Sequence, residues 1–204
     1  FAACAKHFVA YGAAEGGRDY NTVDISDRTL REIYLPPFNA AVSSGVSCVM
    51  TAANELNGIP AVVNDYTINT ILRHDWQFNG LVMSDFNSLF ELQNHGVASS
   101  PREAAELALA VGLDIDLVSG YFLGEGPRLV YNDKQRLIAI DNSVRRILKL
   151  KSSLGLFENP FSDEASEASS ILTTHARAVA KEMALQSLVL LKNSASVLPL
   201  DHNH

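Results

Sequence analysis

Short apolar runs alternate along this chain with longer segments in which apolar residues recur at helical spacing. The runs occupy residues 2–9, 46–51, 81–83 and 113–118. Runs that alternate with helical segments in this way are typical of βα units around a parallel sheet. The third run is wholly apolar and stops abruptly at Ser84, as a buried parallel strand does. We therefore predict an α/β fold.

Capping residues and breakers set the ends of the first predicted helix. Ser26 can cap it, residues 30–41 carry apolar side chains at helical spacing, and Gly45 is a natural end. Pro36-Pro37 lies inside that pattern. Because proline removes a backbone donor and clashes with the preceding turn, we expect the helix to kink or to end its first part there.

Further helices follow the later runs. Ser100-Pro101 joins an N-cap to a proline at the first helical position, and Glu103 completes a capping box. Together they predict a helix that ends at Gly112. Apolar spacing predicts two more helices, around residues 68–72 and 141–154.

The composition changes after residue 157, which divides the chain into three parts. Residues 1–157 contain four βα units, too few to close an eight-stranded barrel of roughly 200 to 250 residues, so we predict half of a (β/α)8 barrel. Residues 158–172 are rich in Ser, Glu, Asp and Ala and predict a linker. Residues 173–204 predict the beginning of a second domain, with a helix opened by Thr174 and a first strand at 187–191.

Charge and hydropathy exclude several classes of protein. The net charge is −7 and the 16 Lys and Arg residues are scattered, so no basic stripe is available for nucleic acid. The longest apolar runs, such as residues 185–191, are far shorter than the roughly 20 residues of a membrane-spanning helix. We expect neither a nucleic-acid partner nor a membrane span.

The two cysteines, Cys4 and Cys48, have no CxxC spacing and lie in apolar runs. This pattern argues against a disulfide framework and against a zinc site. We predict two buried, inert thiols, and nothing in the sequence calls for a metal or another cofactor.

Polar residues at the ends of the apolar runs are the candidates for a site, because ligands bind at the carboxyl ends of parallel strands. Three groups qualify: Lys6-His7, Ala53-Asn54 with Asn57-Gly58, and Ser84-Asp85. The Asp85 carboxylate would be desolvated at the tip of its strand unless a ligand uses it. The alternative is that Asp85 caps a helix over residues 86–92.

Lys6 and His7 are adjacent, so in a regular strand their side chains would point to opposite faces. Both reach one ligand only if the backbone is distorted at the strand end. Otherwise His7 is a core histidine and the Lys6 stem extends to the rim. A metal-ligand role for His7 is disfavoured, because no second ligand stands at the required spacing.

Seven motifs follow one another along the chain: Ala5-Lys6-His7-Phe8, Leu35-Pro36-Pro37-Phe38, Asn57-Gly58-Ile59-Pro60, Gly80-Leu81-Val82-Met83-Ser84-Asp85, Leu113-Asp114-Ile115-Asp116, Gly155-Leu156-Phe157-Glu158-Asn159-Pro160 and Ser187-Leu188-Val189-Leu190-Leu191-Lys192-Asn193. In this order they resemble the motifs of glycoside hydrolase family 3. Tyr11-Gly12-Ala13-Ala14-Glu15-Gly16-Gly17 and Asn21-Thr22-Val23-Asp24 resemble its bacterial periplasmic β-glucosidase branch. The resemblance implies the C-terminal half of the (β/α)8 barrel, a linker, and the start of an α/β sandwich domain.

The resemblance also implies roles for the candidate residues. Asp85 matches the nucleophile of a retaining β-glycosidase that releases terminal β-D-glucosyl residues through a covalent glycosyl-enzyme. Lys6 and His7 match a pair that binds hydroxyls of the sugar and that the family holds through non-proline cis peptide bonds. The acid/base is usually a Glu of the second domain, so it would lie beyond His204. By resemblance the compartment is periplasmic or secreted, and the partners are a β-linked glucoside or oligosaccharide and the rest of the same polypeptide.

Alternatives remain open. The same family contains β-xylosidases and N-acetylhexosaminidases; the latter usually carry an Asp-Ser-His run, which is missing from the loop after His7. Lys6 as a Schiff-base nucleophile in an aldolase-like barrel is a different class of enzyme. If the natural polypeptide ended at His204, it would hold half a site and be an inactive remnant. We expect this chain in isolation to show no glycosidase turnover.

Overall fold

The computed structural model describes residues 1–131 and 133–201. The chain divides into two compact units, Phe1–Glu158 and Asn159–His204. Each unit is described by itself.

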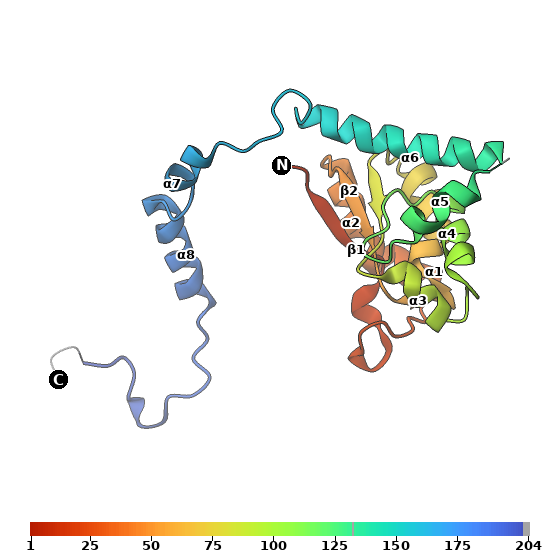
Figure 1. The fold of residues 1–204 in the computed structure, drawn as a ribbon. Helices are drawn as coiled ribbons and strands as arrows, with labels where there is room; N and C mark the ends of the chain where they lie inside the picture. The colour runs from red at the N-terminus through yellow and green to blue at the C-terminus, as the bar shows by residue number, and fades with distance from the viewer. Residues whose placement is uncertain (132, 202–204) are drawn as a thin grey trace. The chain divides into compact units, whose positions relative to one another are not determined.

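A three-stranded parallel sheet forms the centre of the first unit (Figure 1). Its strands are β1 (Cys4–Phe8), β2 (Cys48–Thr51) and β5 (Leu81–Met83), in the order β1-β2-β5. The three strands lie within the first three predicted runs. Because all of them run the same way, their carboxyl ends meet at one edge of the sheet.

The fourth apolar run, predicted as a strand over residues 113–118, forms only an isolated parallel bridge between Ile115 and Met83. The strand prediction was wrong, and a side chain explains why the ladder stops. In a longer ladder the Val82 N–H would donate to a backbone carbonyl of the partner strand. Here it donates to the Asp114 carboxylate at 2.9 Å.

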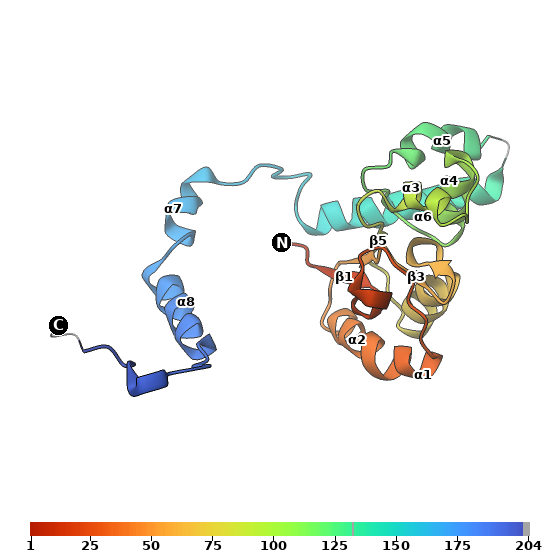
Figure 2. The same ribbon diagram turned by 90° about the horizontal axis from the view of Figure 1, so that it is seen from below.

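Helices lie on both sides of the strands. Figure 2 shows α1 and α2 on one side and α3 to α6 on the other, with α6 beside α4 and α5 in both views. The elements are η1 (Tyr11–Ala13), η2 (Glu15–Gly17), α1 (Asp27–Thr29), the π-helix η3 (Leu30–Tyr34), α2 (Leu35–Ser43), η4 (Ala61–Val63), the π-helix η5 (Tyr66–Asp75), α3 (Ser88–Asn94), α4 (Pro101–Ala110), α5 (Tyr121–Leu129) and α6 (Lys134–Ser153).

The predicted N-caps are confirmed, but the capping box is not, since the Glu103 carboxylate accepts the N–H of Ser99 at 2.7 Å in place of that of Ser100. The Ser26 hydroxyl accepts the N–H of Thr29 at 3.1 Å. The first helix changes from π to α geometry where Pro36-Pro37 occupies the start of α2, as expected of residues that cannot donate a backbone hydrogen bond. The Ser100 hydroxyl accepts the N–H of Glu103 at 3.2 Å and opens α4.

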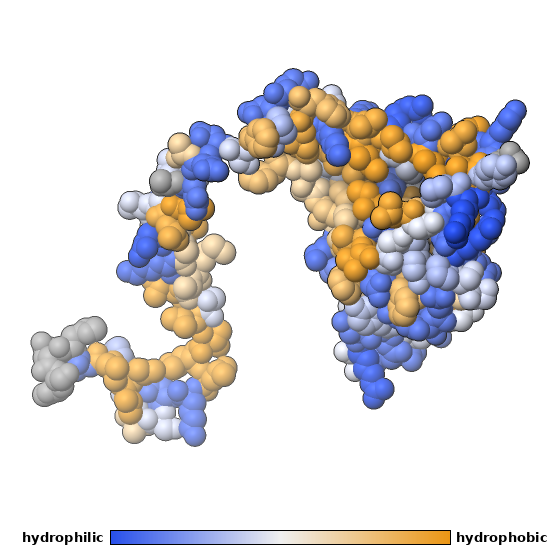
Figure 3. Space-filling model, in the orientation of Figure 1, coloured by the Kyte–Doolittle hydropathy of each residue, from blue (hydrophilic) through white to orange (hydrophobic). Residues whose placement is uncertain are grey.

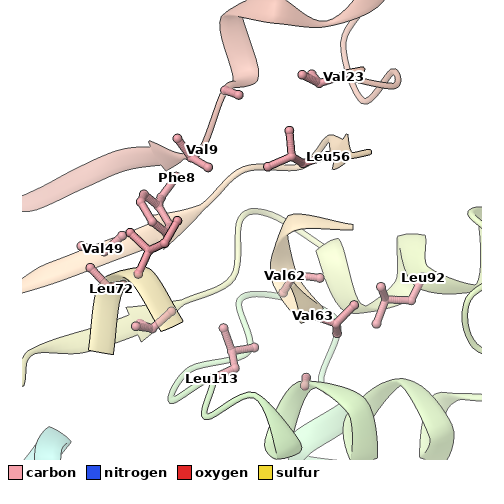
Figure 4. Close-up of a cluster of buried hydrophobic side chains, with 14 of the residues drawn as sticks. Phe8, Val9, Val23, Val49, Leu56, Val62, Val63, Leu72, Leu92 and Leu113 are labelled. Atoms are coloured by element: carbon pink, nitrogen blue, oxygen red, sulfur yellow. The ribbon is translucent and has the colours of Figure 1, made fainter. Parts of the chain in front are cut away.

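The hydrophobic core lies between the sheet and the helices (Figure 4). Phe8 of β1 and Val49 of β2 pack close to Leu72 of η5, and Leu113 extends the cluster; each is at most 1% exposed. Full burial of such a side chain stabilises the fold by about 1.5–3 kcal/mol. The packing of these side chains against the helices therefore holds the strands that carry the candidate site in place.

A small antiparallel hairpin follows β2. Its strands are β3 (Glu55–Leu56) and β4 (Ile59–Pro60), and the turn residues Asn57 and Gly58 both have positive φ, 51° and 85°. Asn-Gly is the preferred pair for such a turn, because Gly has no Cβ to oppose positive φ.

The second unit contains η6 (Glu164–Ser166), α7 (Glu167–Ser170), α8 (Thr174–Ser187) and η7 (Ser194–Ser196). The helix predicted to open at Thr174 is confirmed, with the Thr173 hydroxyl accepting the N–H of Ala176 at 3.1 Å. The strand predicted at 187–191 was wrong. Residues 188–191 have no regular structure, since no described strand pairs with them.

Apolar side chains remain on the surface of the first unit along α6, as the space-filling view shows (Figure 3). Leu137, Ile138, Val144 and Leu148 are each at least 45% exposed. Within the described residues, no helix combines the length and the apolar character needed to cross a bilayer.

Candidate active site

Two side chains from opposite strands of the sheet meet at its carboxyl edge. His7 lies in β1 and Asp85 follows β5, and His7 Nε2 is 3.6 Å from Asp85 Oδ2. Their side chains are 25% and 18% exposed. At 3.6 Å the two groups are not hydrogen-bonded to each other, so both keep capacity for a ligand.

Asp85 does not cap a helix. Its Oδ1 accepts the N–H of the adjacent Phe86 at 2.7 Å, whereas α3 begins at Ser88 with Asn87 at the cap position and no side-chain cap bond. The capping alternative was wrong. One carboxylate oxygen is thus held by the local backbone, and the other points toward the imidazole of His7.

The backbone of β1 departs from a regular strand at the candidate residues. The peptide bonds Lys6–His7 and Phe8–Val9 are both cis, and the register with β2 shifts between Ala5 and Phe8. The strand backbone is therefore distorted at Lys6 and His7, which is the condition stated above for both side chains to reach one ligand. The structure brings His7 to Asp85. Lys6 is exposed, and within the described chain its ammonium group has no hydrogen bond or ion pair.

Tyr11 supports the imidazole from the loop after β1. The two rings are in edge contact, with centroids 5.3 Å apart. The Tyr11 hydroxyl donates a hydrogen bond to Asp19 Oδ1. Burial, the bond to Asp19 and the nearby charges, including that of Asp85, raise the pKa of Tyr11, so this phenol stays a donor at neutral pH. The sequence analysis missed Tyr11; its position four residues after His7 in a glycine-rich loop was the available indication.

Tyr20 lies further along the same loop. Partial burial first, and then the charges of Asp19, Asp85 and Glu91, raise the pKa of Tyr20. Its side chain is 40% exposed. Burial and these acidic charges keep the Tyr20 phenol protonated at neutral pH.

The other predicted site residues have structural partners. The Asn57 side chain exchanges two hydrogen bonds of 2.9 Å with the backbone of Ile25. The Ser84 hydroxyl accepts the N–H of Leu117 at 2.8 Å. Asn54 is fully buried; its amide donates to the Glu55 carbonyl, and its Oδ1 has no hydrogen-bond partner among the described residues.

A second carboxylate on the same stretch of chain is buried in a charged cluster. The Asp114 side chain is 0% exposed and accepts hydrogen bonds from Arg73 at 3.0 Å and from Arg146 at 2.6 Å. Burial lowers the pKa of Arg73, and the charge of Asp114 opposes that change. The cluster joins η5 and α6 to the strand that ends at Asp85.

In the part of the chain that the structure describes, no three His, Cys, Asp or Glu side chains gather as metal ligands would. Cys48 is buried and Cys4 is exposed, so the prediction of two buried thiols was right for Cys48 and wrong for Cys4. The arrangement is a carboxylate beside an imidazole, with the ring of Tyr11 in edge contact with that imidazole, at the edge where ligands bind in parallel α/β proteins. These features define a parallel α/β protein with a site suited to polar, hydroxyl-bearing ligands.

This chain belongs to glycoside hydrolase family 3, since residues 1–150 match the family model described as the Glycosyl hydrolase family 3 N terminal domain. The family resemblance seen in the motifs is confirmed.

Relatives and solved structures agree with that assignment. The chain is 39% identical over 200 residues to a periplasmic beta-glucosidase of Salmonella typhimurium, covering 96% of this chain and 26% of that protein. It is 38% identical to a putative beta-xylosidase of Formosa agariphila, covering 98% of this chain and 27% of the relative. A beta-glucosidase from Listeria innocua, solved in complex with glucose, superposes with a TM-score of 0.90 at 41% identity, covering 98% of this chain and 27% of that one. The chain thus spans about a quarter of the length of these proteins.

Proposed function

We propose that this chain carries the nucleophile half of the active site of a retaining β-glycosidase that removes terminal, non-reducing β-D-glucosyl residues. The observation that carries the proposal is the approach of His7 Nε2 to Asp85 Oδ2, 3.6 Å apart at the carboxyl edge of the sheet. Among the described residues, this partly buried carboxylate is neither paired with an Arg or Lys side chain nor used as a helix cap.

The charge and the orientation of the Asp85 carboxylate suit it to the retaining mechanism. The Phe86 N–H fixes Asp85 Oδ1 and leaves Oδ2 turned to the ligand side. The ionised carboxylate attacks the anomeric carbon, an acid on the opposite face protonates the leaving oxygen, and water later releases the sugar with retained configuration. The two carboxyl groups of such enzymes stand about 5–5.5 Å apart. We propose that the acid comes from a part of the polypeptide outside this chain, and that the sheet is part of a (β/α)8 barrel.

We assign the sugar hydroxyls to His7 and Lys6. Neutral imidazole donates one hydrogen bond and accepts another, which fits a hydroxyl group. Lys6 has an ammonium group with three donors and no partner among the described residues, and it stands next to His7 in β1. A sugar hydroxyl can accept a hydrogen bond from this ammonium group.

The choice of sugar follows the relatives. Two of those named above are a β-glucosidase and a β-xylosidase, which differ in substrate by one hydroxymethyl group. Because the two substrates differ only at this one group, the part of the pocket that receives it decides between them, and xylosidase activity is the second candidate. The ratio of kcat/KM for nitrophenyl β-D-glucoside and nitrophenyl β-D-xyloside, measured on the full-length enzyme, decides between them.

The name of the Salmonella relative supports a periplasmic or secreted location for the full-length protein. A fractionation of cells that express the full-length protein tests this placement. Activity that stays with the cytoplasmic fraction would contradict it.

A trapping experiment tests the nucleophile. The full-length enzyme, inactivated with a 2-deoxy-2-fluoro β-glucoside and cut with trypsin, should carry the label on the peptide 74–102. That peptide contains three carboxylates, Asp75, Asp85 and Glu91. Fragmentation should place the label on Asp85, and the Asp85→Asn variant should remain unlabelled. Label on any other peptide or residue would overturn the assignment.

A further inference from the structure

The segment that carries Asp85 is hydrogen-bonded on both sides to the backbone of Leu117. The Leu117 N–H donates to the Ser84 hydroxyl at 2.8 Å, and the Leu117 carbonyl accepts the N–H of Asn87 at 2.9 Å. The Ser84 N–H also donates to the Ile115 carbonyl at 2.9 Å. Asp85 therefore lies between two residues whose positions depend on where Leu117 stands.

The Asp116 carboxylate folds the loop that contains Leu117. Its Oδ1 accepts a hydrogen bond from the Ser119 hydroxyl, and its Oδ2 accepts the N–H groups of Tyr121 at 2.7 Å and Phe122 at 3.2 Å. These donors come from the loop and from the first turn of α5, so one side chain joins the end of the fourth apolar run to the next helix. Leu117 follows Asp116 directly, and its position depends on this closure.

The loop holds a backbone conformation that one of its residues does not favour. Val118 has a φ of 79°, in the left-handed region, which is unusual for a β-branched residue. Such a conformation persists only where the surrounding structure fixes it. The bonds from Asp116 to Ser119 and Tyr121 close the loop around Val118, so without them the loop would relax to a different path.

We infer that Asp116 is a positioning residue for the candidate nucleophile: it folds the loop that places Leu117, and Leu117 fixes the backbone on both sides of Asp85. The inference rests on the proposed function, in which Asp85 attacks the anomeric carbon. All of these contacts lie within residues 84–122, so they do not depend on the parts of the polypeptide outside this chain. Because misplacing a reacting group by about 1 Å can lower a rate about 100-fold, loss of the loop should slow this attack.

Asp116→Ala and Asp133→Ala, made in the full-length enzyme, form a matched pair. Asp133 also accepts two backbone N–H groups, those of Gln135 and Arg136 at the start of α6, and no hydrogen bond of the described residues joins it to the segment of Asp85. We expect the maximal rate of labelling by a 2-deoxy-2-fluoro β-glucoside to fall about 10- to 100-fold in Asp116→Ala and to stay unchanged in Asp133→Ala. The inhibition constant of glucose, which reports binding of the sugar hydroxyls, should stay near the wild-type value in both variants.

Two conservative variants separate placement from charge. Asp116→Asn keeps one oxygen for the N–H groups of α5 and gains an amide that can donate to the Ser119 hydroxyl, so labelling should stay close to the wild-type rate. Asp116→Glu keeps the charge but is longer by one methylene, so it displaces the loop, and labelling should fall as in Asp116→Ala. A carboxylate that acted through its charge on Asp85 would give the reverse order. This pair of variants also decides the question if Asp116→Ala fails to fold.

The location of the label distinguishes two kinds of failure, so peptide mapping of the labelled wild-type enzyme comes first. With the label on Asp85, the inference is overturned if Asp116→Ala loses no more than Asp133→Ala. It is also overturned if Asp116→Glu is labelled at the wild-type rate or if Asp116→Asn is labelled more slowly than Asp116→Glu. A wild-type enzyme labelled elsewhere would remove the proposed function, and this inference with it.

Discussion

Asp85 and Asp114 carry the same carboxylate in two regions of the protein. Asp85 is 18% exposed, is hydrogen-bonded to one backbone N–H, and has an imidazole 3.6 Å away. Asp114 is 0% exposed and accepts hydrogen bonds from two guanidinium groups and a backbone N–H. A carboxylate with every acceptor site filled stabilises a fold, whereas one left with unused capacity at a strand end is available to a ligand.

The comparison makes opposite predictions for the two residues, and the largest effect concerns Asp85. Asp85→Asn should lower kcat of the full-length enzyme by about 10⁴- to 10⁶-fold, as removal of a nucleophile does in other covalent enzymes. Its unfolding midpoint should change little, because the Phe86 N–H keeps an oxygen acceptor. Steady-state kinetics with nitrophenyl β-D-glucoside and a denaturant titration measure both. Asp75→Asn, an exposed site nearby, is the matched control, and an Asp85→Asn enzyme within tenfold of wild type would break the comparison.

Asp114→Asn should show the reverse behaviour. The substitution keeps the shape but leaves Arg73 and Arg146, 17% and 26% exposed, without their counter-charge. Loss of one partner from a buried pair costs about 3–5 kcal/mol of unfolding free energy. Denaturant unfolding of the full-length protein measures this loss, and kcat of the folded enzyme should stay near the wild-type value. Arg146→Lys, which keeps the charge and loses the two-pronged contact, should cost less. A stable Asp114→Asn protein with lost turnover would reverse the assignment of the two carboxylates.

His7→Ala sharpens the account of the Asp85 region. It removes the imidazole that we assign to a sugar hydroxyl and should lower kcat/KM by roughly 10- to 100-fold, the value of one or two hydrogen bonds. Tyr11→Phe removes only the hydroxyl that donates to Asp19 and keeps the ring beside His7, so a smaller decrease is expected. Kinetics of the two variants test the order. Equal losses in both would show that the Tyr11 hydroxyl matters as much as the His7 imidazole, and would contradict the assignment of a sugar hydroxyl to His7.

The smallest effect concerns a helix end remote from both carboxylates. Ser100→Ala removes the acceptor of the Glu103 N–H at the start of α4 and should lower the unfolding free energy by about 1 kcal/mol. Turnover should not change. Denaturant unfolding checks the value, and Ser100→Asp, which restores an acceptor, should recover most of the stability. A loss as large as that of Asp114→Asn would remove the distinction between a surface cap and the buried cluster.

Local features of the fold could be predicted from the sequence because they depend on neighbours along the chain. The caps at Ser26 and Ser100, the change of helix geometry at Pro36-Pro37 and the first three strands all follow from residues within one or two turns of each other. The strand predictions failed where pairing was required. Residues 113–118 form a single bridge, and residues 188–191 form no strand.

The candidate site was predicted in part for the same reason. His7 lies near the end of one apolar run and Asp85 follows another. Because the carboxyl ends of parallel strands meet at one edge of the sheet, the two residues were predicted to lie at that edge. The distance between them depends on strand pairing, and the contact of the Tyr11 ring with His7 depends on how the loop after β1 folds back. No local pattern encodes that path.

The sequence by itself determined the α/β class, the helix ends and the family motifs, since these are written in periodicity and in short-range hydrogen bonds. Only the tertiary structure decided which distant groups meet. The register of β1 against β2 put Cys4 beside Cys48, and the packing of η5 and α6 put Arg73 and Arg146 around Asp114. Such contacts arise from strand pairing and burial across more than thirty residues of chain, and a one-residue shift in register would undo them.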